Sequence, residues 1–164
     1  MKLYITGCPG SGKSTLARRV AEITGIPCAH LDEVMYEPDP ADPGDNRKRD
    51  PSERQRLFDA ILAGENWIME DAGRECFRAG MEAADMVIAL NIPRAKLRFR
   101  ATRRWLRQRA GRERASYRPD ITMLRLMWKW IGEYDLEAHI LFPEKTRILQ
   151  NQQEIHAFIC EIAH

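Results

Sequence analysis

Nine residues near the start of the chain have the types and spacing of a phosphate-binding loop. Residues 7–15 read GCPGSGKST, which fits the pattern G-x-x-x-x-G-K-[ST]. In such a loop the glycines allow tight turns that point backbone N–H groups at a phosphate. Lys13 is the expected catalytic cation, reaching the β- and γ-phosphates, and Ser14 is the expected Mg²⁺ ligand. The predicted nucleotide-binding residues of the loop are Gly7, Pro9, Gly10, Ser11, Gly12, Lys13, Ser14 and Thr15.

The segments on either side of the loop favour this interpretation over a chance glycine-rich turn. A short apolar run, residues 3–6, precedes the loop, and Leu16, Val20 and Ile23 follow at helical spacing. Strand, loop and helix in this order are the context that the motif requires. The helix N-terminus adds positive potential at the phosphate.

Acidic residues follow two further apolar runs. Residues 27–31 end at Asp32, and residues 67–69 end at Glu70 and Asp71. Ligands bind at the C-terminal ends of parallel strands, so we expect these acids to lie beside the loop. Asp32 could orient or deprotonate an acceptor hydroxyl, and the alternative is a helix cap or an exposed salt bridge.

The rest of the pattern alternates strands with helices. Asp50, Pro51 and Glu53 form a helix start, residues 37–45 have loop composition, and Gly73 and Arg74 open a short helical stretch. A basic helix is expected from Pro93 to about Ala110, residues 121–142 are mostly helical, and Asn151 caps a last helix. The predicted strands are residues 3–6, 27–31, 67–69, 86–90 and 146–150. The pattern predicts a three-layer α/β/α fold with a five-stranded, mostly parallel sheet.

Charge is unevenly distributed, although the formal net charge is only +2. Residues 32–45 are acidic, whereas residues 94–118 carry many arginines against one acid, Glu113. Such a basic block requires an anionic partner or a solvated face. Most of these arginines are explained by a solvated helix face, and Arg100 and Arg104 share one such face.

Length and composition indicate one cytoplasmic domain. A chain of 164 residues suits a single domain, taken here as residues 1–164. No apolar run approaches the roughly 20 residues of a membrane span, and no signal peptide is expected. The four cysteines are scattered, so reduced thiols in the cytoplasm are the simplest interpretation. The protein is expected to be a monomer or a homodimer.

With these residues in place, the chain resembles P-loop proteins of the nucleoside-monophosphate-kinase type. More narrowly, it resembles the DNA topology modulation protein (FlaR-related) family of small kinases. The resemblance implies ATP and Mg²⁺ as cofactors and a sheet of strand order 2-3-1-4-5. It also implies a substrate-binding segment at about residues 33–65 and an arginine-rich lid at about residues 98–120. The motifs that carry it are GCPGSGKST, LDEVMYEP at 31–38, WIMED at 67–71, ADMVIALNIPRAKL at 84–97 and YRPD at 117–120.

The resemblance also implies roles for single residues. In adenylate-kinase-like enzymes, arginines at the offsets of Arg100 and Arg104 from the proline stack on adenine and touch phosphate, respectively. The lid position makes Arg112, Arg114 and Arg118 candidates for phosphate contact; we assign Arg114 a catalytic role and Arg118 a substrate-binding role. Residues 150–152 resemble the loop whose backbone meets the adenine, which adds Asn151 and Gln152 to the nucleotide site.

The resemblance departs from the family pattern after the third strand. Family members often carry Asp-Gly-Asn where this chain has residues 70–74, EDAGR. Alignment on the arginine places Arg74 as a phosphate-binding arginine of the substrate site and Glu70 as the family acid. Alignment on the other position selects Asp71. We prefer Asp71 beside the metal and keep Glu70 as an open alternative.

Three functions remain in competition. The first is an ATP-binding kinase that transfers the γ-phosphate to a nucleotide or another small acceptor. The second is an ATP-dependent nucleic-acid-associated (DNA topology) regulator without small-molecule kinase activity. The third is a nucleotide-binding protein without turnover, a non-catalytic alternative that Lys13, Ser14 and the lid arginines disfavour. The basic block follows the fourth strand, in the lid position, and no separate reading helix is present, which favours the kinase. We expect no membrane partner.

Overall fold

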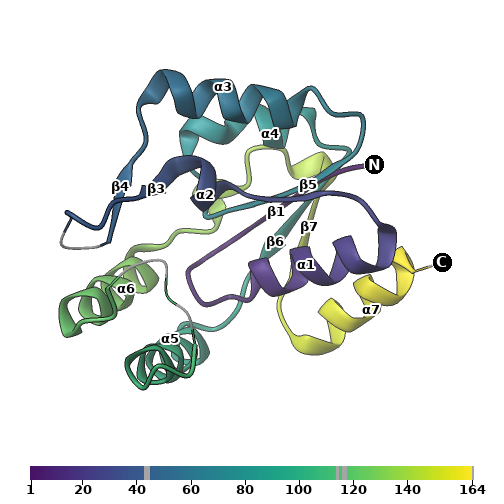
Figure 1. Ribbon diagram of the computed structural model, residues 1–164. Helices are drawn as coiled ribbons and strands as arrows, with labels where there is room; N and C mark the ends of the chain where they lie inside the picture. The colour runs from purple at the N-terminus through teal and green to yellow at the C-terminus, as the bar shows by residue number, and fades with distance from the viewer. Residues whose placement is uncertain (43–44, 114, 116–117, 164) are drawn as a thin grey trace.

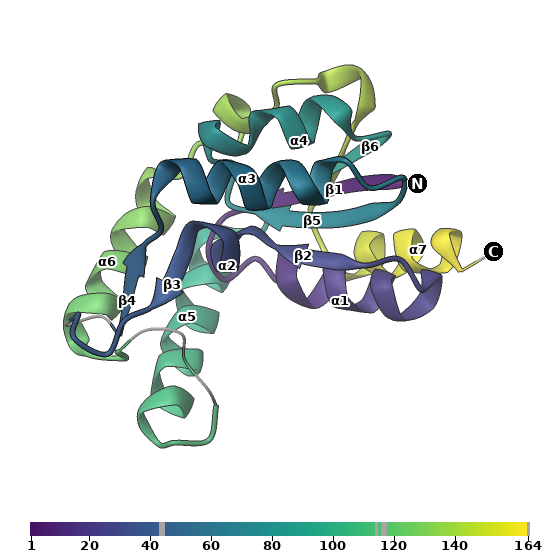
Figure 2. The ribbon, with the colours of Figure 1, turned by 45° about the horizontal axis from the view of Figure 1, so that its top comes forward.

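A five-stranded parallel sheet forms the centre of the computed structural model, which describes residues 1–42, 45–113, 115 and 118–163. Figures 1 and 2 show it from two directions. The strand order is β2-β5-β1-β6-β7, and every neighbouring pair is parallel. The strands are β1 (Lys2–Gly7), β2 (Cys28–His30), β5 (Trp67–Asp71), β6 (Met86–Leu90) and β7 (Thr146–Leu149).

Two additional strands change the numbering relative to the predicted order 2-3-1-4-5. β3 (Tyr36–Pro38) and β4 (Asn46–Lys48) pair with each other in a separate antiparallel sheet. With these two left out, the five strands of the main sheet follow the expected order along the chain. The prediction of a continuous loop at 37–45 missed the hairpin because its strands are short and polar. The pairing is supported by an ion pair across it, with Arg47 Nε 2.7 Å from Glu37 Oε1.

Helices cover both faces of the sheet (Figure 1). α1 (Lys13–Thr24) and α7 (Gln152–Ile162) pack on one face, over a core that includes Leu3 and Ile5. α3 (Pro51–Leu62) and α4 (Arg78–Ala83) cover the other face, which includes Tyr4. Alternate residues of β1 therefore serve opposite cores, as a doubly covered strand requires.

The predicted helix starts are confirmed at both caps. The Asp50 side chain accepts a hydrogen bond from the Ser52 N–H at the start of α3, and Asn151 accepts one from Glu154 at the start of α7. A five-residue helix, α2 (Leu31–Met35), was not predicted, because residues 27–31 read as one strand. It turns the chain directly after β2. The 3-10 turn η1 (Glu75–Phe77) and α4 form the predicted helical stretch after β5.

α5 (Arg94–Arg109) and α6 (Ile121–Glu133) form a pair that extends away from the sheet (Figure 2). Indole N–H groups tie the pair together: Trp105 donates to the Asp120 carbonyl at 2.8 Å, and Trp128 donates to Thr102 Oγ1 at 3.2 Å. The prediction that 121–142 is mostly helical was too long. The helix ends before Tyr134, which is extended, and two 3-10 turns, η2 (Glu137–His139) and η3 (Pro143–Lys145), lead to β7. None of the described helices is long and apolar enough to span a membrane.

Candidate active site

The phosphate-binding loop joins β1 to α1 in the conformation that its glycines permit. Gly10 and Gly12 have φ angles of 80° and 100°, in the left-handed region that favours glycine. The turn is closed by a hydrogen bond of 3.1 Å from the Ser11 N–H to the Cys8 carbonyl. α1 begins at Lys13, so the helix N-terminus faces the loop.

The carboxylate of Glu70, at the end of β5, contacts residues of both the loop and the neighbouring strand β2. Ser14 Oγ donates to Glu70 Oε1 at 3.0 Å, and Lys13 Nζ lies 4.0 Å from Glu70 Oε2. The His30 Nδ1 atom, from β2, lies 2.9 Å from Glu70 Oε1. The Glu70 side chain is only 4% exposed. The hydrogen bond to Glu70 raises the pKa of His30 and outweighs the opposing effect of burial.

Asp71, which was predicted as the metal ligand, contacts the turn after β5 and not Ser14. Its side chain is fully buried and accepts hydrogen bonds from the Gly73 N–H at 2.8 Å and from the Arg74 N–H. It also forms an ion pair with Arg74 Nη1. The structure therefore joins Ser14 to Glu70, the alternative left open, and uses Asp71 to hold the turn after β5. The metal role of Asp71 stays a prediction.

Arg74 links Asp71 to Asp32. Arg74 Nη2 lies 2.6 Å from Asp32 Oδ1, and the guanidinium carbon lies 5.8 Å from the centre of the Tyr36 ring. Burial lowers the pKa of Arg74, but Asp71 and Asp32 outweigh burial and raise it above its ordinary value. Asp32 lies in α2, and its side chain is 62% exposed, so its carboxylate faces solvent. The salt bridge weighed as an alternative role for Asp32 is thus present.

The predicted arginines fall into two groups. Arg100 is brought to the loop: its Nη1 donates to the Ser11 carbonyl at 3.0 Å. Arg104 is instead paired with Glu113, with Nε 3.1 Å from Oε1, and Arg107 contacts the same carboxylate. Arg112 and Arg118 are exposed. Arg114 lies outside the described residues.

The residues predicted at the adenine end are placed at the start of α7. Asn151 uses its side chain as the helix cap, accepting from the Glu154 N–H at 3.0 Å and donating to Glu154 Oε1 at 2.6 Å. Gln152 is exposed. A backbone contact between this loop and a base would leave the cap intact.

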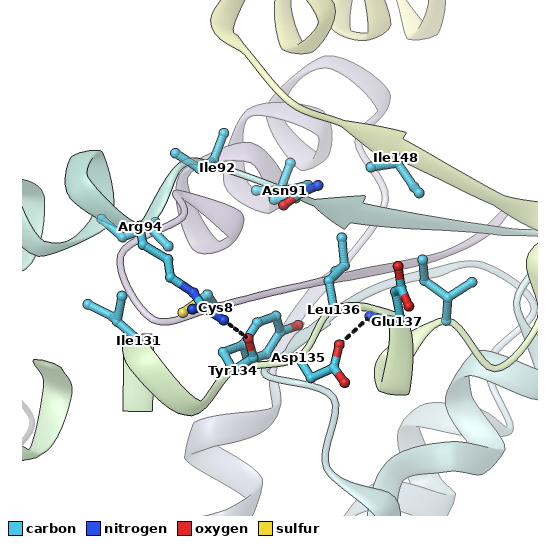
Figure 3. Close-up of a pocket in the computed structure, with 13 residues that line it drawn as sticks. Cys8, Asn91, Ile92, Arg94, Ile131, Tyr134, Asp135, Leu136, Glu137 and Ile148 are labelled. Atoms are coloured by element: carbon cyan, nitrogen blue, oxygen red, sulfur yellow. Dashed lines mark hydrogen bonds between the residues drawn. The ribbon is translucent and has the colours of Figure 1, made fainter. Parts of the chain in front are cut away.

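A cavity of about 300 Å³ lies beside the loop, between Cys8, the end of β6 and the segment after α6 (Figure 3). Arg94, at the start of α5, donates across it from Nη2 to the Tyr134 carbonyl at 3.4 Å. Burial raises the pKa of the Cys8 thiol to about 11. Arg94, Tyr134 and His30 were not predicted as site residues. His30 ends a strand, and this position is the signal that could have marked it as a candidate.

The residues present fit a magnesium ion bound together with nucleotide. Mg²⁺ usually binds through one or two carboxylates plus substrate phosphates and water. Glu70 Oε2 is buried and accepts no hydrogen bond from the described part of the chain. Ser14 Oγ donates to the other carboxylate oxygen, Oε1. Among the described residues, no group of three or more His, Cys, Asp or Glu side chains is arranged to hold a metal alone. The ion would therefore depend on the phosphates for its remaining ligands.

Comparison with known families gives one domain match. The family model described as "AAA domain" (AAA_18) matches residues 3–117, which include the phosphate-binding loop, the two acids that end β5, and helix α5.

Comparison with solved structures gives similar folds at low identity. A gluconokinase from Sinorhizobium meliloti 1021 is 16% identical, with a TM-score of 0.54 over 99% of this chain and 93% of that one. A putative kinase from Chloroflexus aurantiacus is 17% identical, with a TM-score of 0.57 over 98% and 95%. A shikimate kinase from Bacteroides thetaiotaomicron is 14% identical, with a TM-score of 0.54 over 98% and 94%. The fold is thus one that P-loop kinases share.

Proposed function

The chain belongs to the AAA domain family, and from this premise we propose that it is an ATP-dependent phosphotransferase acting on a small acceptor. The observation that carries the proposal is the convergence of Lys13, Ser14 and Glu70 at the loop. Phosphoryl transfer requires mainly positioning and charge neutralisation, which a cradle, a metal and nearby cations supply. The loop would form the cradle, Ser14 and Glu70 would hold the metal, and Lys13 is a cation beside them.

The nucleotide would be held by the loop and α5. Backbone N–H groups of the loop and Lys13 would bind the phosphates, and Arg100, which donates to the Ser11 carbonyl, would stack on the base. Ser14 and Glu70 would hold Mg²⁺, which supplies charge neutralisation at the β- and γ-phosphates. The backbone at Asn151 and Gln152 would border the base.

The acceptor would bind on the other side of the loop. Asp32 is exposed and would orient an acceptor hydroxyl. Arg74 is held in place by buried Asp71, and it would contact the acceptor once Asp32 leaves Arg74 to bind that hydroxyl. Arg104, Arg114 and Arg118 would approach from the lid, at about residues 98–120. Arg104 must first leave Glu113.

The narrower assignments are also proposals. Membership of the topology modulation protein (FlaR-related) family, the adenylate-kinase-like type, the single domain at 1–164, the substrate segment at 33–65 and the cytoplasmic location rest on the sequence. The names of the gluconokinase and shikimate kinase neighbours favour a small hydroxyl compound over a macromolecule. The exposed arginines of α5 keep the alternative, an ATP-dependent nucleic-acid-associated regulator, open to test.

An ADP-release assay with ATP-Mg²⁺ against a panel of nucleotides, nucleosides, sugars and sugar acids tests the proposal. We expect one acceptor class to raise ADP release well above the rate without acceptor. The Lys13→Ala variant is the control for contaminating kinases. If no acceptor raises the rate, and ATP still binds, the non-catalytic alternative is favoured.

A further inference from the structure

His30 has no assigned role, yet it contacts the residue on which the metal site depends. The pairing of β2 with β5 places His30 directly beside Glu70 in register. Neighbouring residues in register share a face of the sheet, so the backbone brings the imidazole and the carboxylate together. Nδ1 lies 2.9 Å from Glu70 Oε1. A carboxylate only accepts hydrogen bonds, so Nδ1 carries the proton.

This contact decides how the Glu70 carboxylate is turned. The last torsion of a glutamate is broad, so its two oxygens need external contacts to be fixed. Ser14 and His30 both donate to Oε1, which leaves Oε2 buried, with no hydrogen bond from any residue that the structure describes, and 4.0 Å from Lys13 Nζ. Without His30, the carboxylate can turn towards Lys13 and close that gap into a tight ion pair. Lys13 would then be drawn from phosphate, and Oε2 from metal.

We propose that His30 is a positioning residue, whose Nδ1–H fixes Glu70 Oε1 so that Oε2 stays available to Mg²⁺ and Lys13 stays available to phosphate. The inference rests on the proposed nucleotide site at the loop. It makes a specific demand on side-chain chemistry. An asparagine amide can replace a donor at Nδ1, whereas a glutamine amide corresponds to the more distant Nε2. Packing alone would make no such distinction.

The test measures binding of Mn²⁺·ADP, with Mn²⁺ as a paramagnetic substitute for Mg²⁺ detected by electron paramagnetic resonance, alongside calorimetry of ADP without metal. The variants are His30→Ala, His30→Asn and His30→Gln, with His156→Asn, at an exposed position of α7, as a matched control. We expect His30→Ala and His30→Gln to weaken Mn²⁺·ADP binding by about tenfold or more. His30→Asn and the control should stay within about threefold of wild type.

Each other outcome is decisive. Equal Mn²⁺·ADP binding by wild type and His30→Ala overturns the positioning role and leaves the nucleotide site standing. Equal weakening by His30→Asn and His30→Gln also overturns it, since the donor at Nδ1 would then be irrelevant. Should His30→Ala fail to fold, the comparison of His30→Asn with His30→Gln decides. If wild type binds neither ADP nor Mn²⁺·ADP, the proposed function itself fails.

Discussion

Adjacent carboxylates at the end of β5 have different partners because alternate residues of a strand face opposite sides. Glu70 shares its face with Ile68, on the side of α1, and reaches Ser14 and Lys13. Asp71 shares the opposite face with Met69 and holds Arg74. A sequence alignment that shifts by one residue exchanges these roles, which is why residues alone left both acids open as metal candidates.

Lys13→Ala tests the cradle at the level of a single charge. The Lys13 side chain is 12% exposed, and its ammonium group would contact the β- and γ-phosphates. Its removal should abolish turnover and weaken ATP binding by more than tenfold, about 1.4 kcal/mol. Calorimetric titration with ATP-Mg²⁺ measures this. An affinity within threefold of wild type would contradict the assignment.

Asp32→Asn and Asp71→Asn form a matched pair at the two ends of Arg74. Asp32 is 62% exposed, so its variant should change the free energy of unfolding by less than about 1 kcal/mol. It should lower kcat more than tenfold with little change in the KM for ATP. Asp71 is buried, so its variant should cost roughly 2 kcal/mol or more of stability. Urea unfolding and steady-state kinetics separate the two effects, and a fully active Asp32→Asn enzyme would reduce Asp32 to a structural ion pair.

Cys8 should be chemically inert despite its place in the loop. Burial raises its pKa from 9.0 to about 11, so at neutral pH the reactive thiolate is about 100-fold rarer than for an ordinary thiol. Under native conditions, iodoacetamide should label exposed Cys160 first and leave Cys8 largely unmodified. Mass spectrometry of peptides at timed intervals measures this, with a urea-unfolded sample as the control. Native labelling of Cys8 at the rate of Cys160 would contradict the burial.

Elements with strong local signals were predicted well, and those that depend on distant partners were not. The apolar strand 86–90, the Asp50 cap of α3 and the Asn151 cap of α7 were all confirmed. The β3–β4 hairpin was missed because it is held by ion pairs of Arg47 and Arg49 with Glu37, which no periodicity records. In the site, the motif identified the loop, but the contact of His30 with Glu70 depends on strand register and could not be predicted from residue types.

The α5 end of the lid should close over the nucleotide when it binds. Glu113 forms ion pairs with Arg104 and Arg107 of α5. Between α5 and Glu113 lies Gly111, whose φ angle of 68° is in the left-handed region. ATP-Mg²⁺ should compete for Arg104, close the lid and exclude water from the phosphates. Hydrogen exchange over residues 98–113 should therefore slow on addition of ATP-Mg²⁺, while α4, which has no place in the proposed nucleotide site, serves as an internal control. Unchanged exchange over 98–113 at saturating nucleotide would argue against a closing lid.

At the scale of the whole molecule, the two charged regions lie on the same side as the loop. The basic α5 and its partner α6 project from the C-terminal edge of the sheet, and the acidic segment around α2 and β3 lies at the same edge (Figure 2). Several acids of this segment are neutralised by arginines: Glu37 pairs with Arg47 and Arg49, and Asp32 pairs with Arg74. We expect the basic charge of α5 to serve the phosphates of a small nucleotide, because Arg100 of this helix reaches the phosphate-binding loop.

Duplex DNA should therefore bind only weakly and without sequence preference. Binding through the exposed arginines of α5 would rest on phosphate contacts, so its affinity should fall steeply with salt. Fluorescence anisotropy with two unrelated duplexes at several salt concentrations, with and without ATP-Mg²⁺, measures this. We expect equal affinities for both duplexes, loss of binding near physiological salt, and competition by ATP, because nucleotide and duplex would share Arg100 and Arg104. Tight binding to one duplex at physiological salt, strengthened by ATP, would instead favour the nucleic-acid-associated regulator over the kinase.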